Sequence, residues 1–247
     1  MGLTAVSYLG LNTVSILDEL AAYLTETTGI DMKRAGPPRS STQAIEADRD
    51  TRGDVVWACG HLTMQLRASD PGCLEIIGAP VFTGQSGPVY HAVVVARREG
   101  PTSLIDALDL RLGVNEIESW SGHLGLRAHL GQQGSSRWFS DVTLTGSHLE
   151  SVEALATGSV GVISVDNTVW EQLLDDPPES IEPHLAGLVI IDRTVDWPAP
   201  PISIGGAVGA EASRQIRSAL GSLGAGDVVG LDAVRESSHL DYAVMAG

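Results

Sequence analysis

The sequence predicts an α/β fold in which strands and helices alternate and helices cover both faces of parallel sheets. Short apolar runs of strand length recur from residue 3 to residue 192, and segments with apolar residues at helical spacing lie between them. The composition agrees, because 43% of the 247 residues are hydrophobic and only 4% are aromatic, as in ordinary soluble α/β proteins. A chain of this length can form one large domain or two lobes.

The first third of the chain reads as three strands and one clear helix. A helix is expected over residues 14–26, where apolar residues recur at helical spacing. The polar stretch 33–50 is expected to be a loop with a short helix at 42–47. The runs that predict strands here are short and apolar, and lie at 3–9, 54–58 and 74–79.

The remainder repeats the pattern after a segment rich in Gly and Pro at 80–88. Capping boxes at Ser103/Asp106 and Ser147/Glu150 predict helix starts, and Gly158 is expected to end the second of these helices. Further helices are expected at 166–174 and 209–223, and strands at 90–97, 112–114, 141–145, 160–165 and 188–192.

The charge restricts the partners. The formal net charge is −16, from 15 basic and 31 acidic residues, which argues against nucleic acid and anionic membrane surfaces. A site for an anion would have to work through short-range hydrogen bonds, because long-range steering is unfavourable. No apolar run reaches the length of a membrane span, so no membrane insertion is expected.

No metal and no cofactor are expected. His, Asp and Glu do not fall at a metal-ligand spacing, and phosphate-binding, dinucleotide-binding and nucleophile-elbow motifs are missing. Cys59 and Cys73 are expected to be buried small hydrophobes. The N-terminus lacks a basic region and a cleavage site, which predicts a cytoplasmic protein. If an export signal has been removed, the location is periplasmic or extracellular.

The most informative stretch runs from Asn115 to His123. A strand-like run stops there at the hydroxyls of Ser119 and Ser121, and a helix then begins. The first N–H groups of a helix lack internal partners and the helix dipole is positive at this end, so the stretch suits an anion held by neutral donors. The alternative is an ordinary N-cap.

Two other predicted strand ends carry residues that could bind a ligand or take part in catalysis. Gly146, in Thr145-Gly146-Ser147-His148, lets the backbone approach a ligand, and His148 in the first turn can donate to an oxyanion. The alternative for His148 is an exposed first-turn histidine. Asp166 follows a buried run and either caps the next helix or faces a cationic group of a ligand.

Two aromatic residues are weaker candidates. Tyr90 follows the flexible Gly/Pro segment and can close over a ligand, or it can be a half-buried strand residue. Trp57 ends a strand and forms either a pocket wall or part of the core. Because ligands bind beyond the carboxyl ends of parallel strands, the segments at 119–122, 145–148 and 166 are expected to cluster at one end of a sheet.

Taken in order, these segments resemble the phosphate/phosphonate-type substrate-binding proteins of ABC transporters, in the branch whose members often lack export signals. The resemblance runs from about residue 8 to residue 201. Its pieces are the run that ends at Trp57, the segment 84–90, Ser119-x-Ser121-Gly122, the segment 145–152, Val165-Asp166-x-Thr168-x-Trp170 and the segment 194–201.

The resemblance implies the two-lobed periplasmic-binding-protein (type 2) fold, with each lobe a mostly parallel sheet flanked by helices. The chain would cross between lobes twice, so that residues 1–88 and 194–247 form one lobe and 89–193 the other. It also implies that the anionic group is held in the cleft between the lobes. The matching positions are Ser119, Ser121, Gly122 and His148, with Tyr90 as a further donor and Asp166 facing a ligand amine.

The sequence departs from the family pattern at Trp120, where phosphonate binders commonly have a small residue. A bulky indole there would reshape the anion pocket and leaves another small anion or a zwitterion open as the ligand. Trp120 and Trp57 are therefore counted with the candidate ligand-binding residues.

Three functions compete. The first is a solute-binding protein that closes over a small anion or zwitterion and delivers it to an ABC transporter permease. The second is a cytoplasmic lyase or dehydratase on the same fold, with His148 and either Asp166 or Glu118 as acid and base. The third is a ligand sensor that passes closure on to a partner. We favour binding, since no catalytic constellation is visible.

Overall fold

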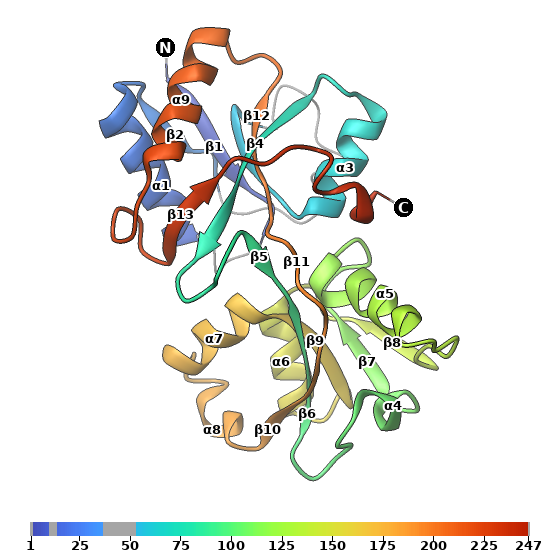
Figure 1. Cartoon of the computed structure of the whole chain (residues 1–247). Coiled ribbons are helices and arrows are strands. Elements are labelled where there is room, and N and C mark those ends of the chain that lie inside the picture. Colours follow the sequence, from blue (N-terminus) through green and yellow to red (C-terminus); the bar gives the residue numbers. More distant parts are fainter. Residues whose placement is uncertain (1, 10–13, 37–52, 247) are drawn as a thin grey trace. The chain divides into compact units, whose positions relative to one another are not determined.

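The computed structural model describes residues 2–9, 14–36 and 53–246 (Figure 1). The short helix expected at 42–47 lies outside these residues. The chain divides into two compact units, Met1–Val89 with Pro198–Gly247 (unit 1) and Tyr90–Trp197 (unit 2). Residues 194–197 thus group with the middle of the chain. No helix among the described residues is both long enough and apolar enough to span a bilayer.

Unit 1 is built on a six-stranded sheet of order β13-β4-β12-β3-β1-β2. β1 pairs in parallel with β2 and β3, whereas β12 lies antiparallel between β3 and β4, and β13 is antiparallel to β4. The strands are β1 (Leu3–Ser7), β2 (Met32–Arg34), β3 (Val55–Trp57), β4 (Leu74–Phe82), β12 (Ile202–Gly205) and β13 (Leu231–Arg235).

The helices of unit 1 are α1 (Val14–Thr28), α3 (Gly60–Ser69), α9 (Ala210–Ser222) and the short η4 (Ala243–Met245). α1 and α9 bury Leu20, Leu24 and Ile216 in one core with strand residues such as Val55 and Ile77. Because leucines at helical spacing form one apolar stripe on α1, burying that stripe against the sheet stabilises the helix more than its propensity does.

Unit 2 is built on a five-stranded sheet of order β10-β6-β9-β7-β8 (Figure 1). β9, β7 and β8 are mutually parallel neighbours, and β6 runs antiparallel between β9 and β10. The strands are β6 (Ala92–Arg97), β7 (Arg111–Val114), β8 (Asp141–Leu144), β9 (Val162–Asp166) and β10 (Leu188–Arg193).

Helices cover both faces of the unit 2 sheet. Val93 and Val95 of β6 share a core with α6 (His148–Ala156), α7 (Asn167–Asp175) and α8 (Glu182–Leu185). Val94 instead packs with α4 (Leu104–Ala107) and α5 (Gly125–Gln132). Successive strand residues point to opposite faces, so the all-apolar run of β6 is the sequence signature of a strand buried on both sides.

The chain passes between the units at β5 (Val89–Tyr90) and β11 (Trp197–Pro198), which pair in a two-stranded sheet. The strand that follows each passage, β6 or β12, is antiparallel to both of its neighbours. The sheets are therefore mixed, although most strands of each still run in one direction. This confirms the mostly parallel sheets that the resemblance implies; which strands run the other way is decided by pairing with distant neighbours.

Most expected elements are confirmed, including the two capped helices. Ser103 and Ser147 accept hydrogen bonds from the N–H groups of Asp106 and Glu150, and Gly158 follows α6 with φ of +82°. Elements that were not expected include β2, α3, β12 and β13. These are short or weakly patterned segments that the packing of unit 1 orders.

Candidate functional site

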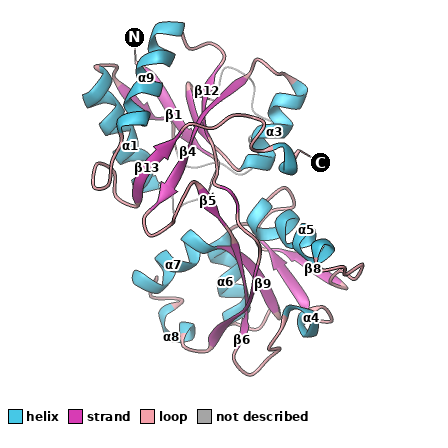
Figure 2. Ribbon diagram, viewed as in Figure 1, coloured by secondary structure: helices cyan, strands magenta, loops and turns pink. Residues whose placement is uncertain are grey.

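Three strands of unit 2 bring the candidate residues to one edge. β7 pairs in parallel with both β8 and β9, so the carboxyl ends of all three strands meet there. A helix start follows each strand: the π-helix η3 (Trp120–Leu124) after β7, α6 after β8 and α7 after β9 (Figure 2). The expected clustering of the three strand ends is thus present in unit 2.

The first strand end leads into η3, which continues directly into α5. The Ser119 hydroxyl caps η3 by accepting a hydrogen bond from the N–H of Gly122 at 3.1 Å. The N–H of Leu124 donates to the Ser119 carbonyl at 2.9 Å, the wide spacing of a π-turn. In a π-helix each N–H bonds to the carbonyl five residues earlier, whereas in an α-helix the spacing is four. One more N–H group at the start of the helix therefore lacks a helical partner.

Asn115 opens the most informative stretch of the sequence, but no role of its own was predicted for this residue. Its side-chain oxygen is buried without a hydrogen-bond partner. A Cβ on Gly122 would lie 1.7 Å from that oxygen, so the Asn115 side chain occupies the space that only glycine leaves open. The Asn115 carbonyl accepts from the N–H of Gly146 at 3.1 Å, which ties the first strand end to the second.

His148 lies at the second strand end, in the first turn of α6. Its Nε2 is 3.3 Å from the Ser121 hydroxyl, and its Nδ1 is buried without a partner. Burial away from water lowers the pKa of His148 from 6.5 to about 4, because desolvation disfavours the charged imidazole. His148 is therefore neutral at pH 7, when it can donate one hydrogen bond.

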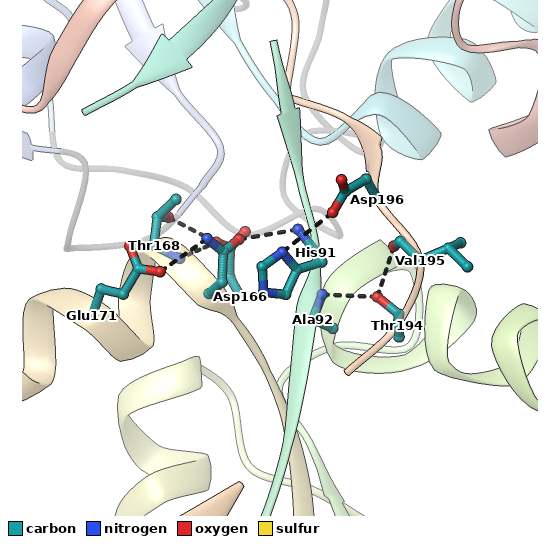
Figure 3. Close-up of polar contacts among 9 residues, drawn as sticks. His91, Ala92, Asp166, Thr168, Glu171, Thr194, Val195 and Asp196 are labelled. Atoms are coloured by element: carbon teal, nitrogen blue, oxygen red, sulfur yellow. Dashed lines mark hydrogen bonds and ion pairs between the residues drawn. The ribbon is translucent and has the colours of Figure 1, made fainter. Parts of the chain in front are cut away.

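Asp166 ends β9 and caps α7, as one of the two sequence interpretations predicts. Its Oδ1 accepts from the N–H of Thr168 at 2.9 Å and from the Thr168 hydroxyl at 2.7 Å (Figure 3). Burial raises the pKa of Asp166 from 3.8 to about 6, against the opposing effect of the Thr168 hydrogen bonds. A carboxyl in this state is partly protonated near pH 6.

Ser164 connects Asp166 to the hydroxyl cluster. The buried Ser164 hydroxyl donates to the Ser121 carbonyl at 2.6 Å. Residues two apart on a strand face the same side of the sheet, so Asp166 leaves β9 on the side where η3 packs. Ser121 therefore lies beside both His148 and the end of β9.

The two aromatic candidates of unit 2 are both buried. Trp120 is 4% exposed and packs edge-on against Trp197, with ring centroids 5.2 Å apart. Its indole nitrogen lies 2.9 Å from where a Cβ on Gly125 would stand, so the missing side chain of Gly125 makes room for the ring. Trp120 therefore packs within unit 2. Tyr90 is 2% exposed on β5.

His91 and Asn167 hold the start of α7 against the segment before β6, and neither was expected. The N–H of Asn167 donates to the His91 carbonyl, and the N–H of His91 donates to the Asn167 side chain, both at 3.0 Å. His91 Nδ1 also lies 3.4 Å from a carboxylate oxygen of Asp196 (Figure 3). Only the antiparallel pairing of β6 with β9 brings these residues together.

Trp57 belongs to the core of unit 1. It is fully buried, its indole N–H donates to the Pro200 carbonyl at 3.0 Å, and its ring stacks on Phe82. The nearby start of α3 is covered by the C-terminal segment, where the Met245 carbonyl lies 2.7 Å from His61 Nδ1. The apolar-core interpretation of Trp57 is therefore the one its contacts support.

The edge of unit 2 thus offers serine hydroxyls, backbone N–H groups and a neutral imidazole, with one partly buried carboxyl beside them. This set suits hydrogen bonding to a small oxyanion. Within the described part of the chain, no three His, Cys, Asp or Glu side chains come together in a way that could hold a metal ion.

The chain has the periplasmic-binding-protein fold. PhnD1 from Prochlorococcus marinus, solved in complex with methylphosphonate, matches with a TM-score of 0.79 and 17% identity over 98% of this chain and 95% of that chain. A binding protein component of a phosphonate ABC transporter from Pseudomonas aeruginosa matches with a TM-score of 0.76 and 19% identity, over 97% and 83%. These likenesses establish the fold.

The family follows from the sequence match. The family described as "ABC transporter, phosphonate, periplasmic substrate-binding protein" matches residues 8–239. The chain belongs to this family of substrate-binding proteins.

One curated protein also matches over a short stretch. A segment of 100 residues is 29% identical to the DNA polymerase III subunit alpha of Thermus aquaticus, covering 40% of this chain. The chain spans only 8% of the length of that protein, so the match says nothing of what this chain does.

Proposed function

We propose that this chain binds a small phosphonate-like or phosphate-like anion at the carboxyl edge of the unit 2 sheet. The observation that carries the proposal is the meeting of three capped helix starts at one edge, with Ser121 Oγ 3.3 Å from His148 Nε2. Helix starts direct unpaired N–H groups and a positive dipole toward an anion.

Each candidate residue then has a distinct role. Ser119, Ser121 and the first-turn N–H groups around Gly122 donate to the oxygens of the anion, and His148 donates from its neutral ring. Tyr90 is a further donor, and Asp166 faces the polar or cationic part of the ligand. Trp120 supports the helix start from within unit 2 by its contact with Trp197. Trp57 is left out because its N–H already binds Pro200.

Methylphosphonate is the first ligand to test, because PhnD1 from Prochlorococcus marinus was solved with it. We propose that the bound ligand is then delivered to an ABC transporter permease, in keeping with the family. Delivery to a permease requires the periplasmic or extracellular alternative rather than the cytoplasmic one, in keeping with the family description, and cell fractionation with an antibody against the native protein would test this location.

Calorimetric titration of the full chain with methylphosphonate, phosphate, methanesulfonate and glycine tests the proposal. We expect saturable binding of at least one phosphorus oxyanion and none of glycine. Ser121→Ala should weaken that binding about tenfold, the effect of one lost hydrogen bond to a charged group. Ser159→Ala, an exposed serine before β9, is the matched control and should leave affinity unchanged. Silence across all the anions would refute the proposal.

A further inference from the structure

Resting on the function proposed above, we infer that the site takes its anion in the singly charged form that still carries an acidic proton, and that Asp166 accepts the hydrogen bond from that proton. The ligand class is thus hydrogen phosphonate or hydrogen phosphate monoanions. The doubly charged forms and oxyanions that have no proton, such as sulfonates, are disfavoured.

The first reason is the charge of the edge. The segments 115–122, 145–150 and 166–171 that follow β7, β8 and β9 contain no Lys or Arg. They contain several carboxylates, namely Glu116, Glu118, Glu150, Asp166 and Glu171. Neutral hydrogen-bond donors can stabilise one negative charge on the ligand beside these carboxylates. A second negative charge on the ligand would be repelled by the carboxylates, and these segments offer no cationic side chain to offset it.

The second reason is the position of an acceptor beside the donors. The Ser164–Ser121 hydrogen bond of 2.6 Å fixes the end of β9 against η3, and Asp166 leaves β9 on that side. A carboxyl oxygen facing an oxyanion is repulsive unless a proton lies between them. The acidic hydrogen of a monoanion supplies this proton and turns the repulsion into a charge-assisted hydrogen bond. The raised pKa of Asp166 also favours sharing a proton.

Among the described residues, the elements that pack beside β9 bring carboxyls and histidines toward Asp166. α7 contributes Glu171, whose oxygen lies 3.4 Å from the Asn167 amide. The segments beside β6 contribute His91, paired with Asp196 (Figure 3). α6 contributes Glu150 and the neutral His148. η3 contributes His123, whose Nδ1 lies 2.7 Å from the Ile117 carbonyl.

Calorimetry at several pH values, in two buffers that differ in ionisation enthalpy, measures both affinity and proton exchange. Above the second pKa of methylphosphonate, the free dianion must take one proton from the buffer to become the bound monoanion. We therefore expect uptake of one proton per ligand bound. Above this pKa the apparent Kd should rise about tenfold per pH unit, because the fraction of methylphosphonate present as the monoanion falls. Methanesulfonate, similar in shape but without a proton, should bind at least tenfold more weakly at pH 6.

Asp166→Asn is the informative variant, because Asn caps helices as well as Asp does. It should remove the preference for methylphosphonate over methanesulfonate and flatten the rise of Kd with pH. Asp175→Asn, at the exposed end of the same helix, makes the same charge change and should behave as the wild type does. Circular dichroism of both variants confirms that they are folded.

The outcomes are distinguishable. Binding of methylphosphonate without proton uptake, with methanesulfonate equally tight, overturns this inference and leaves the proposed function standing. Proton uptake with methanesulfonate as well places the proton on the protein, at Asp166 or His148, and also overturns it. An unchanged pH profile in Asp166→Asn removes Asp166 as the acceptor. Binding of no anion at all rejects the proposed function together with this inference.

Discussion

Replacing Gly122 by alanine tests whether the first strand end is as tightly built as the structure shows. The new Cβ would lie 1.7 Å from Asn115 Oδ1, 2.8 Å from Asn115 Cγ and 3.1 Å from the Ser119 hydroxyl, where an ordinary contact is 3.4–4 Å. The Asn115 side chain must therefore leave its place. Its oxygen has no hydrogen-bond partner to lose, so the expected cost is that of overpacking, about 1–3 kcal/mol of unfolding free energy.

Urea unfolding followed by tryptophan fluorescence measures this cost. Of the five tryptophans all but Trp57 lie in unit 2, so the signal reports mainly on the unit that carries the substitution. In thermal unfolding, each kcal/mol corresponds to about 2–4 °C for a domain of 150–250 residues, and to somewhat more for a smaller unit. Affinity for the proposed anion should fall at the same time, because the Ser119 cap and the Gly122 N–H move together.

Two further variants make the test specific. Gly131→Ala lies in α5, where a Cβ would meet nothing within 4 Å, and should stabilise the protein by up to about 1 kcal/mol through helix propensity. Asn115→Ala combined with Gly122→Ala should recover most of the loss, since the obstructing side chain is gone. If Gly122→Ala is as stable as the wild type, or if the double variant is no better than the single one, the assigned packing is wrong.

The other predictions concern neighbouring features. Gly125→Ala should destabilise unit 2 by about 1–3 kcal/mol, because its Cβ would lie 2.8 Å from the Trp120 carbonyl oxygen and 2.9 Å from the indole nitrogen; unchanged urea unfolding would contradict this. The pKa shifts of His148 and Asp166 should oppose each other in the pH dependence of stability. In Asp166→Asn the lowered pKa of His148 acts alone, so the unfolded state binds more protons and stability rises from pH 4 to 6.5. In His148→Gln the raised pKa of Asp166 acts alone, so the folded state binds more protons and stability falls from pH 3.8 to 6. Slopes of the same sign in the two variants would refute the assignment. Tyr242→Phe should cost about 1–2 kcal/mol, since the buried hydroxyl donates to the carbonyl of residue 199 at 2.6 Å; an equal urea midpoint would show that this bond contributes nothing.

Local patterns predicted much of the edge of unit 2. Strand-like runs that end at Val114, at Leu144 and at Asp166 identify strand ends, and the capping pattern that begins at Ser147 identifies the helix that follows. Strand–helix alternation then implies parallel strands, whose ends share an edge. These inferences succeed because each depends on residues close together along the chain. In the structure β9, β7 and β8 are neighbours in one sheet, so their carboxyl ends do share an edge.

Other features of the site depend on contacts between distant residues. Nothing in the local sequence distinguishes an α-turn from a π-turn at Trp120, or shows that Asn115 fills the space beside Gly122. His91 meets Asn167 only because β6 inserts antiparallel beside β9. Trp57 was a candidate pocket wall from its position after a strand, and its bond to a carbonyl more than a hundred residues away shows the core role instead.

The amino-acid sequence by itself determined where strands stop and capped helices begin, which residues stand at those points, and that their donors are uncharged, because hydrogen-bonding capacity and helix capping are local properties. Tertiary structure alone decided which of these points meet, which aromatic rings are buried, and how far the ionisation of His148 and Asp166 shifts. Burial and strand pairing arise from residues far apart in the chain, so no local pattern contains them.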